Sequence, residues 1–159
     1  MNGFFPVAAE AKRKPLSLLP ACGECGLYRG CSSPKMKAHG QGRRKIMVVG
    51  DVPNSTDDGR GTPFHGKPGK LLREVLAKFD VDLDHDCWSI NALRCNSSPY
   101  PSAASVGYCR PLSVTDVQEL KPEVIILLGR SAIKSIIGWV WKDDVGEGGG
   151  EGTGRTRWD

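Results

Sequence analysis

Three short apolar runs place the strongest constraint on how this chain folds. They are "KIMVVGD" (45–51), "CWSINAL" (87–93) and "EVIILLG" (123–129), and such runs are typical of strands buried in a parallel sheet. Apolar residues at helical spacing follow the first run over about 69–79, and a helical pattern follows the second over about 103–120. Strands that alternate with helices predict an α/β domain with a parallel sheet, in which ligands bind at the carboxyl ends of the strands.

The segments between these elements give further expectations. The stretch from Val52 to Gly69 is rich in Gly, Pro, Asp and Ser, which predicts a loop. Pro111 predicts a break in the helix around 103–120. The segment "SAIKSIIGW" predicts one more helix after the third strand, and the segment with the first three cysteines predicts an irregular loop.

The length of 159 residues fits one domain. We expect residues 1–20 to be an extension and residues 21–142 to form the domain. We expect residues 143–159 to be a disordered tail, because this glycine-rich segment has almost no apolar residues. A sheet of three strands is thin for an α/β domain, so we also expect that the last strand and helix are missing.

The composition indicates a globular protein in contact with water. Hydrophobic residues make up 39% and charged residues 25%, and the net charge of +4 permits an anionic partner without requiring one. No apolar run approaches the roughly 20 residues that a membrane span needs. The charges of the N-terminus follow a short apolar patch, which is the wrong order for a signal peptide. We therefore expect a cytoplasmic protein with reduced thiols and no membrane partner.

The cysteines suggest a metal site. Cys22 and Cys25 form a CxxC pair, and Cys95 and Cys109 follow far along the chain. Four soft ligands suffice for tetrahedral zinc or for an iron–sulfur cluster. A zinc ribbon normally brings a second CxxC pair, so the wide second spacing favours a cluster, while buried thiols without metal remain an alternative.

Five motifs together resemble those of the family-4 uracil-DNA glycosylases, the iron–sulfur enzymes of their superfamily. They are "CGECGLYRGCSSPKM", "IMVVGDVPNSTDDGRGTPFHGKPGKLLREVL", "CWSINALRC", "YCRP" and "KPEVIILLGRSA", in the family's order and approximate spacing. The resemblance covers residues 22 to about 142. It implies a three-layer α/β/α fold, a [4Fe–4S] cluster, and a monomer that hydrolyses the N-glycosidic bond of uracil in DNA, leaving an abasic site.

The resemblance also assigns roles to individual residues. The cluster ligands would be Cys22, Cys25, Cys95 and Cys109. Cys87 would then be a core residue, and Cys31 is an alternative ligand because it is close to Cys25 in the sequence. The cluster would have a structural role, tying the N-terminal segment to the region after the second strand.

Four further residues correspond to the family's uracil site. Phe64 would stack on the flipped base, with a core residue as the alternative. Asn91 would pair with the edge of uracil, with a structural cap as the alternative. Asp51 would supply the catalytic carboxylate, at a position where the family usually has Glu. Asp57 would screen against the methyl group of thymine, with a solvated loop acid as the alternative. Asn54 stands where the family motif has Gly, which leaves the turn geometry open.

One family motif is missing from the sequence. The family has a late His-Pro motif whose histidine assists the leaving group, and none of the three histidines here precedes a proline. We therefore expect a truncated or frame-disrupted chain with little or no activity. The alternatives to an enzyme are a catalytically impaired remnant that binds its cluster and DNA, and a zinc-binding interaction module. DNA would meet basic residues at the site mouth, from 35–37, 42–45, Lys67 and Lys70.

Overall fold

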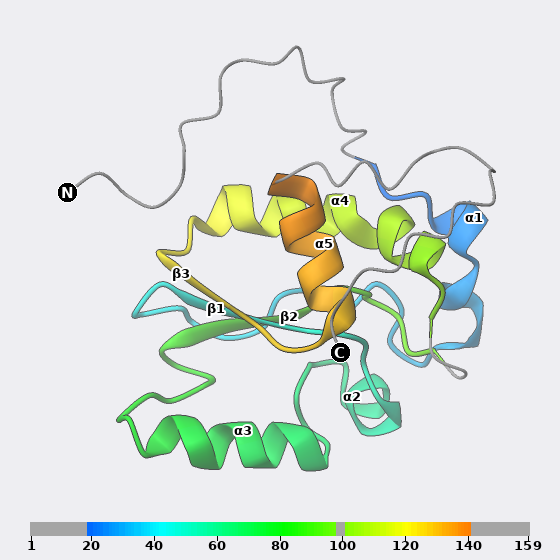
Figure 1. The fold of residues 1–159 in the computed structure, drawn as a ribbon. Coiled ribbons are helices and arrows are strands. Elements are labelled where there is room, and N and C mark those ends of the chain that lie inside the picture. Colours follow the sequence, from blue (N-terminus) through cyan, green and yellow to red (C-terminus); the bar gives the residue numbers. More distant parts are fainter. Residues whose placement is uncertain (1–18, 98–100, 141–159) are drawn as a thin grey trace, which may run out of the picture.

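The computed structural model describes residues 19–97 and 101–140, and the expected extension and tail lie almost wholly outside this part (Figure 1). In chain order the elements are α1 (Cys22–Cys25), η1 (Leu27–Gly30), β1 (Ile46–Gly50), α2 (Ser55–Arg60), α3 (Lys67–Ala77), β2 (Cys87–Asn91), α4 (Ala103–Leu120), β3 (Val124–Leu127) and α5 (Arg130–Val140). None of the described helices combines the length and apolar character of a membrane span.

The three strands form one parallel sheet with the order β2-β1-β3. Helices α4 and α5 cover one face of this sheet, and α2 and α3 lie on the other face (Figure 1). The expected three-layer α/β/α arrangement with a parallel sheet is therefore confirmed. Because all strands run in the same direction, the residues that follow β1 and β2 meet at one edge of the sheet.

The central strand β1 divides the core into two parts. Met47 and Val49 point to the α4–α5 side, where they pack with Ala132 and Ile136 of α5. Val48 points to the opposite side, where it packs among apolar residues that include Leu72 and Leu76 of α3 and Cys87. This alternation follows from the two-residue period of side chains along a strand.

The predicted break at Pro111 is wrong, because α4 continues through this residue. A proline inside a helix removes one backbone hydrogen bond and clashes with the preceding turn. In α4 this loss is offset by tertiary packing, since Val106, Pro111 and Val114 are all buried. Packing of an apolar helix face usually outweighs a single unfavourable residue.

The predictions of irregular structure in two segments are also partly wrong. The expected loop between Val52 and Gly69 contains α2, which begins with a capping box: the Asn54 side chain accepts from the Asp57 backbone, and the Asp57 side chain accepts from the Asn54 backbone. The spacing of Asn54 and Asp57 is a signal of this motif in the sequence. The first cysteine segment contains the short helices α1 and η1.

Candidate functional site

Gly50, Asn91 and Phe64 lie close together where β1 and β2 end. A Cβ atom on Gly50 would lie 2.4 Å from the Asn91 Oδ1 atom and 2.9 Å from two atoms of the Phe64 ring. Any side chain at position 50 would collide with both groups. Glycine therefore allows the Asn91 amide and the Phe64 ring to lie close to the backbone at the end of β1. The structure thus brings together Phe64 and Asn91, which lie 27 positions apart in the sequence.

The side-chain amide of Asn91 is buried. Asn91 is only 4% exposed, and its Nδ2 atom has no hydrogen-bond partner among the described residues. A buried donor without a partner costs free energy comparable to a lost hydrogen bond. The Nδ2 donor of Asn91 is therefore free to meet an acceptor of a ligand.

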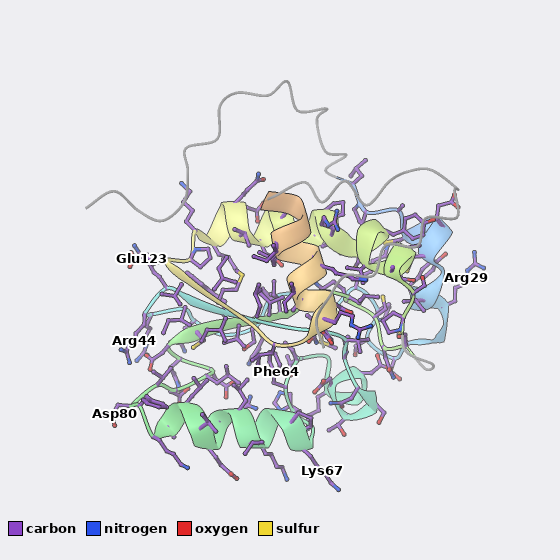
Figure 2. The ribbon with its side chains drawn as sticks, viewed as in Figure 1. Arg29, Arg44, Phe64, Lys67, Asp80 and Glu123 are labelled. Carbon is purple, nitrogen blue, oxygen red and sulfur yellow. The ribbon has the colours of Figure 1, made fainter. Side chains whose placement is uncertain are left out.

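Phe64 is held in an unusual backbone conformation. Its φ angle is +63°, in the left-handed region that residues other than glycine rarely adopt. Its carbonyl accepts a hydrogen bond from Arg73 Nη1 on α3, and the next residue, His65, donates its backbone N–H to Asp57 Oδ1 at 2.6 Å. In Figure 2 the Phe64 side chain lies between the sheet and the layer of α2 and α3.

Both carboxylate oxygens of Asp57 are occupied by the backbone. Besides the His65 N–H, Asp57 accepts the N–H of Asn54 at 3.1 Å, and the residue is 3% exposed. These bonds anchor the loop that carries Phe64 to the first turn of α2. The proposed contact of Asp57 with a thymine methyl group stays a prediction. The two hydrogen bonds by which Asp57 holds the loop are observed in the structure. Asn54, at the position of the family's Gly, forms the N-cap of α2.

Asp51 follows β1 and faces the start of α5. Its Oδ1 atom accepts the backbone N–H of Ala132 at 3.0 Å. A Cβ atom on Gly129 would lie 2.4 Å from the carboxylate atoms of Asp51, so the side chain packs directly on that glycine. A carboxylate is favoured at a helix N-terminus by the free N–H groups and the helix dipole. The carboxylate is therefore fixed at the same sheet edge as Asn91.

A pocket near α1 and α4 is lined by all four cysteines that the family resemblance implies as ligands. Cys22, Cys25, Cys95 and Cys109 line this pocket, together with residues that include Leu27, Tyr28, Leu93 and Leu112. The segment before α1 is tied to α4 by the hydrogen bond from Ala21 N to Tyr108 O at 3.1 Å. Four thiols in mainly apolar surroundings form the donor set that iron–sulfur clusters use.

The donor set of this pocket suits a soft metal centre. Four thiolates are the ligands of an iron–sulfur cluster and also of a tetrahedral zinc ion. Within residues 19–97 and 101–140, no three His, Cys, Asp or Glu side chains are already placed closely enough to hold one metal ion.

Burial changes the acidity of the thiols in this pocket. It raises the pKa of Cys95 to about 11 and also raises the pKa of Cys109. Backbone N–H groups oppose this effect: Lys35 N donates to Cys95 Sγ at 3.3 Å, and the Arg94 backbone donates to Cys109. Since a raised pKa keeps a thiol protonated at neutral pH, metal binding must release protons, and higher pH favours it.

The two remaining cysteines lie outside this pocket lining. Cys87 is fully buried in the core on the α3 side of the sheet, as predicted. Cys31 donates its thiol to the carbonyls of Leu27 and Asn96 at 3.2 and 3.4 Å. Cys31 thus lies close to the segment after Cys95, but its thiol is hydrogen-bonded to backbone carbonyls and does not line the pocket.

The basic residues are divided between the two ends of the sheet. Lys67 begins α3 and Lys70 follows in its first turn, both exposed (Figure 2). Residues 42–45 instead precede β1, where Lys45 pairs with Glu123 at 2.9 Å. The expectation that 42–45 flank the mouth of the site is therefore wrong, because they lie at the amino end of the strand whose carboxyl end forms the site.

Comparisons with known proteins agree with this geometry. The sequence profile of the uracil DNA glycosylase superfamily matches residues 38–156. The chain therefore belongs to the uracil DNA glycosylase superfamily, which confirms the resemblance read from the motifs.

Similar curated proteins refine the comparison. The type-4 uracil-DNA glycosylase of Pyrobaculum aerophilum is 31% identical over 124 residues, which cover 76% of this chain and 61% of the relative. The type-4 enzyme of Archaeoglobus fulgidus is 30% identical over 118 residues, covering 73% of this chain and 58% of the relative. That of Thermotoga maritima is 28% identical over 97 residues, covering 58% and 49%. The chain thus spans about three fifths or less of the length of these relatives.

Proposed function

We propose that this chain recognises uracil in DNA and hydrolyses its N-glycosidic bond, leaving an abasic site. The observation that carries the proposal is the buried Asn91 amide, whose Nδ2 atom has no partner among the described residues, beside the Phe64 ring. An enzyme that acts on a base must take it out of the stack, hold it between side chains and read its Watson–Crick edge.

The chemistry of an amide explains the choice of uracil. Asn91 has one acceptor and two donor hydrogens, and uracil offers an N3–H donor beside carbonyl acceptors. Cytosine has an acceptor at N3 and a donor at N4, so the same amide in the same orientation opposes it. Phe64 supplies the flat face on which the flipped base stacks.

The bond-breaking step places positive charge on the sugar. Water adds to C1′ as the bond from C1′ to uracil N1 breaks, and the uracil anion leaves and is then protonated. Glycosidic cleavage of this kind has an oxocarbenium-like transition state. Asp51 is the residue proposed to stabilise this charge, because its carboxylate is held at the sheet edge by Ala132 N–H. A fixed carboxylate stabilises the charge without reorganising during the reaction.

The proposed cofactor is a [4Fe–4S] cluster held by Cys22, Cys25, Cys95 and Cys109. When bound it would supply a structural crosslink rather than a step of the hydrolysis. The chain's own bonds support this role: Arg94 is 3% exposed and pairs with Asp116 of α4, and its Nη1 atom donates to Met36 O at 3.3 Å. These contacts join the segment that carries Cys95 to the helix that carries Cys109.

A second candidate function is a glycosylase-fold protein that binds its cluster and uracil-containing DNA without excision. The observation that favours it is the missing late His-Pro motif, since none of the three histidines in the sequence precedes a proline. Loss of one donor to a developing anion typically costs about 10²–10³ in rate. DNA binding in either case uses phosphate contacts at the start of α3, near Lys67 and Lys70.

Excision and binding separate the two candidates. The protein, loaded with iron, is incubated with single-stranded DNA containing one uracil, and abasic sites are counted by alkaline cleavage. Because the late His-Pro motif is missing from the sequence, we expect only slow cleavage, at uracil but not at thymine or cytosine, and Asp51→Asn should slow it further, by at least about 10²-fold. Binding of a non-cleavable uracil strand without excision would select the second candidate. If the protein neither excises uracil nor binds the uracil strand selectively, both candidate functions are wrong.

A further inference from the structure

Arg73 of α3 links the loop of Phe64 to a second loop of the protein. Its Nη1 atom donates to the Phe64 carbonyl. Its Nε and Nη2 atoms donate to the two carboxylate oxygens of Asp84 at 3.3 and 2.9 Å. The Arg73 side chain is 28% exposed, so this fork of bonds is partly shielded from water. Bidentate pairing with a carboxylate fixes the plane of a guanidinium.

The Phe64 backbone needs such a restraint. A left-handed conformation at an aromatic residue persists only where surrounding contacts maintain it. One contact is steric, because a Cβ atom on Gly69 would lie 1.8 Å from the Phe64 carbonyl oxygen. The carbonyl therefore sits directly against the first turn of α3, and Arg73, one turn further on, holds it there by a hydrogen bond.

We infer that Arg73 is a positioning residue that directs the Phe64 ring toward Gly50 and Asn91. The guanidinium fixes the Phe64 carbonyl through the Nη1 hydrogen bond. The ring is then held where a flipped base can stack on it. This inference rests on the proposed function for its consequence in DNA binding, but the effect on the ring itself does not require DNA.

A purely structural role for Arg73 would be the ion pair that ties α3 to residues 80–86. Asp84→Asn separates the two roles, because it removes the charge pair while leaving the Phe64 carbonyl contact and an oxygen acceptor for the guanidinium. Lys78→Met is the matched control for charge, since it removes an exposed cation from the other end of α3. Arg73→Met removes every hydrogen bond of the guanidinium, including those to Asp84 and to the Phe64 carbonyl.

The first measurement is an affinity ratio. The affinity for a strand with a non-cleavable uracil nucleotide is divided by the affinity for the same strand with an abasic-site analogue, which isolates the contribution of the base. Arg73→Met should lower this ratio by about fivefold to 100-fold, the range in which loss of a stacking aromatic falls. Asp84→Asn and Lys78→Met should leave the ratio unchanged, although Asp84→Asn should lower the melting temperature.

The second measurement observes the ring without DNA. In protein labelled on its phenylalanines, the wild type should show a nuclear Overhauser contact between the Phe64 ring and the Gly50 α-protons, and Arg73→Met should lose it. The positioning role is refuted if Arg73→Met keeps both the Overhauser contact and the wild-type affinity ratio. It is also refuted if Asp84→Asn lowers the affinity ratio as much as Arg73→Met does. If the wild type binds both strands equally, the proposed function fails, and the Overhauser contact alone then decides whether Arg73 positions the ring.

Discussion

Replacing Asn91 by Asp or Ala should abolish the preference of this protein for uracil over cytosine in DNA. Asn91 is 4% exposed and its Nδ2 atom has no partner among the described residues, so its donor is available to the base. The Ala variant removes both hydrogen bonds to the base edge. The Asp variant replaces the donor by a second acceptor and adds a charge. A bidentate contact to a base is worth about 1–3 kcal/mol of discrimination, or roughly 5-fold to 150-fold in relative affinity.

Competition binding with matched strands that differ at one base measures this preference directly. Ser89→Ala is a suitable control, because Ser89 lies two residues earlier on β2 and is also buried, and its hydroxyl has no partner within the described part of the chain. This control should keep the preference for uracil. If the Asn91 variants keep the preference for uracil over cytosine, Asn91 has a structural role and does not read the base.

Removing any one of the four pocket cysteines should release the iron. Protein purified without oxygen should be brown and contain about four iron atoms per chain. In Cys22→Ala, Cys25→Ala, Cys95→Ala and Cys109→Ala the charge-transfer absorbance should bleach, and iron should fall below about one atom per chain. The expected loss is large because each thiolate would be a direct ligand in the proposed site, and the crosslink between the α1 segment and α4 would disappear with the metal.

The remaining cysteines provide matched controls for this series. Cys31→Ala should keep the iron, since its thiol already donates to the carbonyls of Leu27 and Asn96. Cys87→Ala should also keep the iron, while leaving a small core cavity that costs about 1 kcal/mol of folding free energy. A colourless protein with stoichiometric zinc would contradict the cluster and favour the zinc-binding module.

Local sequence patterns predicted the elements that carry the site. The three apolar runs became three parallel strands, of which β1 and β2 are mostly buried and β3 is partly exposed at the edge of the sheet. Parallel strands bring their carboxyl ends to one edge, and this rule alone placed Asp51 and Asn91 near one another. The four cysteines came together in one pocket for the same reason, since Cys95 follows β2 and α1 packs beside α4.

Other features depend on tertiary contacts that no local pattern reports. Pro111 was expected to break α4, but buried neighbours outweigh its lost hydrogen bond. The bond from Arg73 to the Phe64 carbonyl joins a side chain to a backbone atom nine residues away, so nothing in residue type marks it. The contact of Gly50 with Asn91 and Phe64 is also invisible in the sequence, since a glycine at a strand end has many uses. By contrast, the Asn54–Asp57 capping box did have a signal that predicts a helix.

The side-chain amide of Asn91 offers the most direct view of uracil recognition. In ¹⁵N-labelled protein its two Nδ2 protons give a pair of resonances, assigned by their absence in Asn91→Ala. Addition of a strand with a non-cleavable uracil nucleotide should shift this pair strongly downfield, because the free N–H groups gain an acceptor. The same strand with cytosine should leave it in place. Resonances that stay fixed with uracil, or move equally with cytosine, would contradict recognition of the base by Asn91.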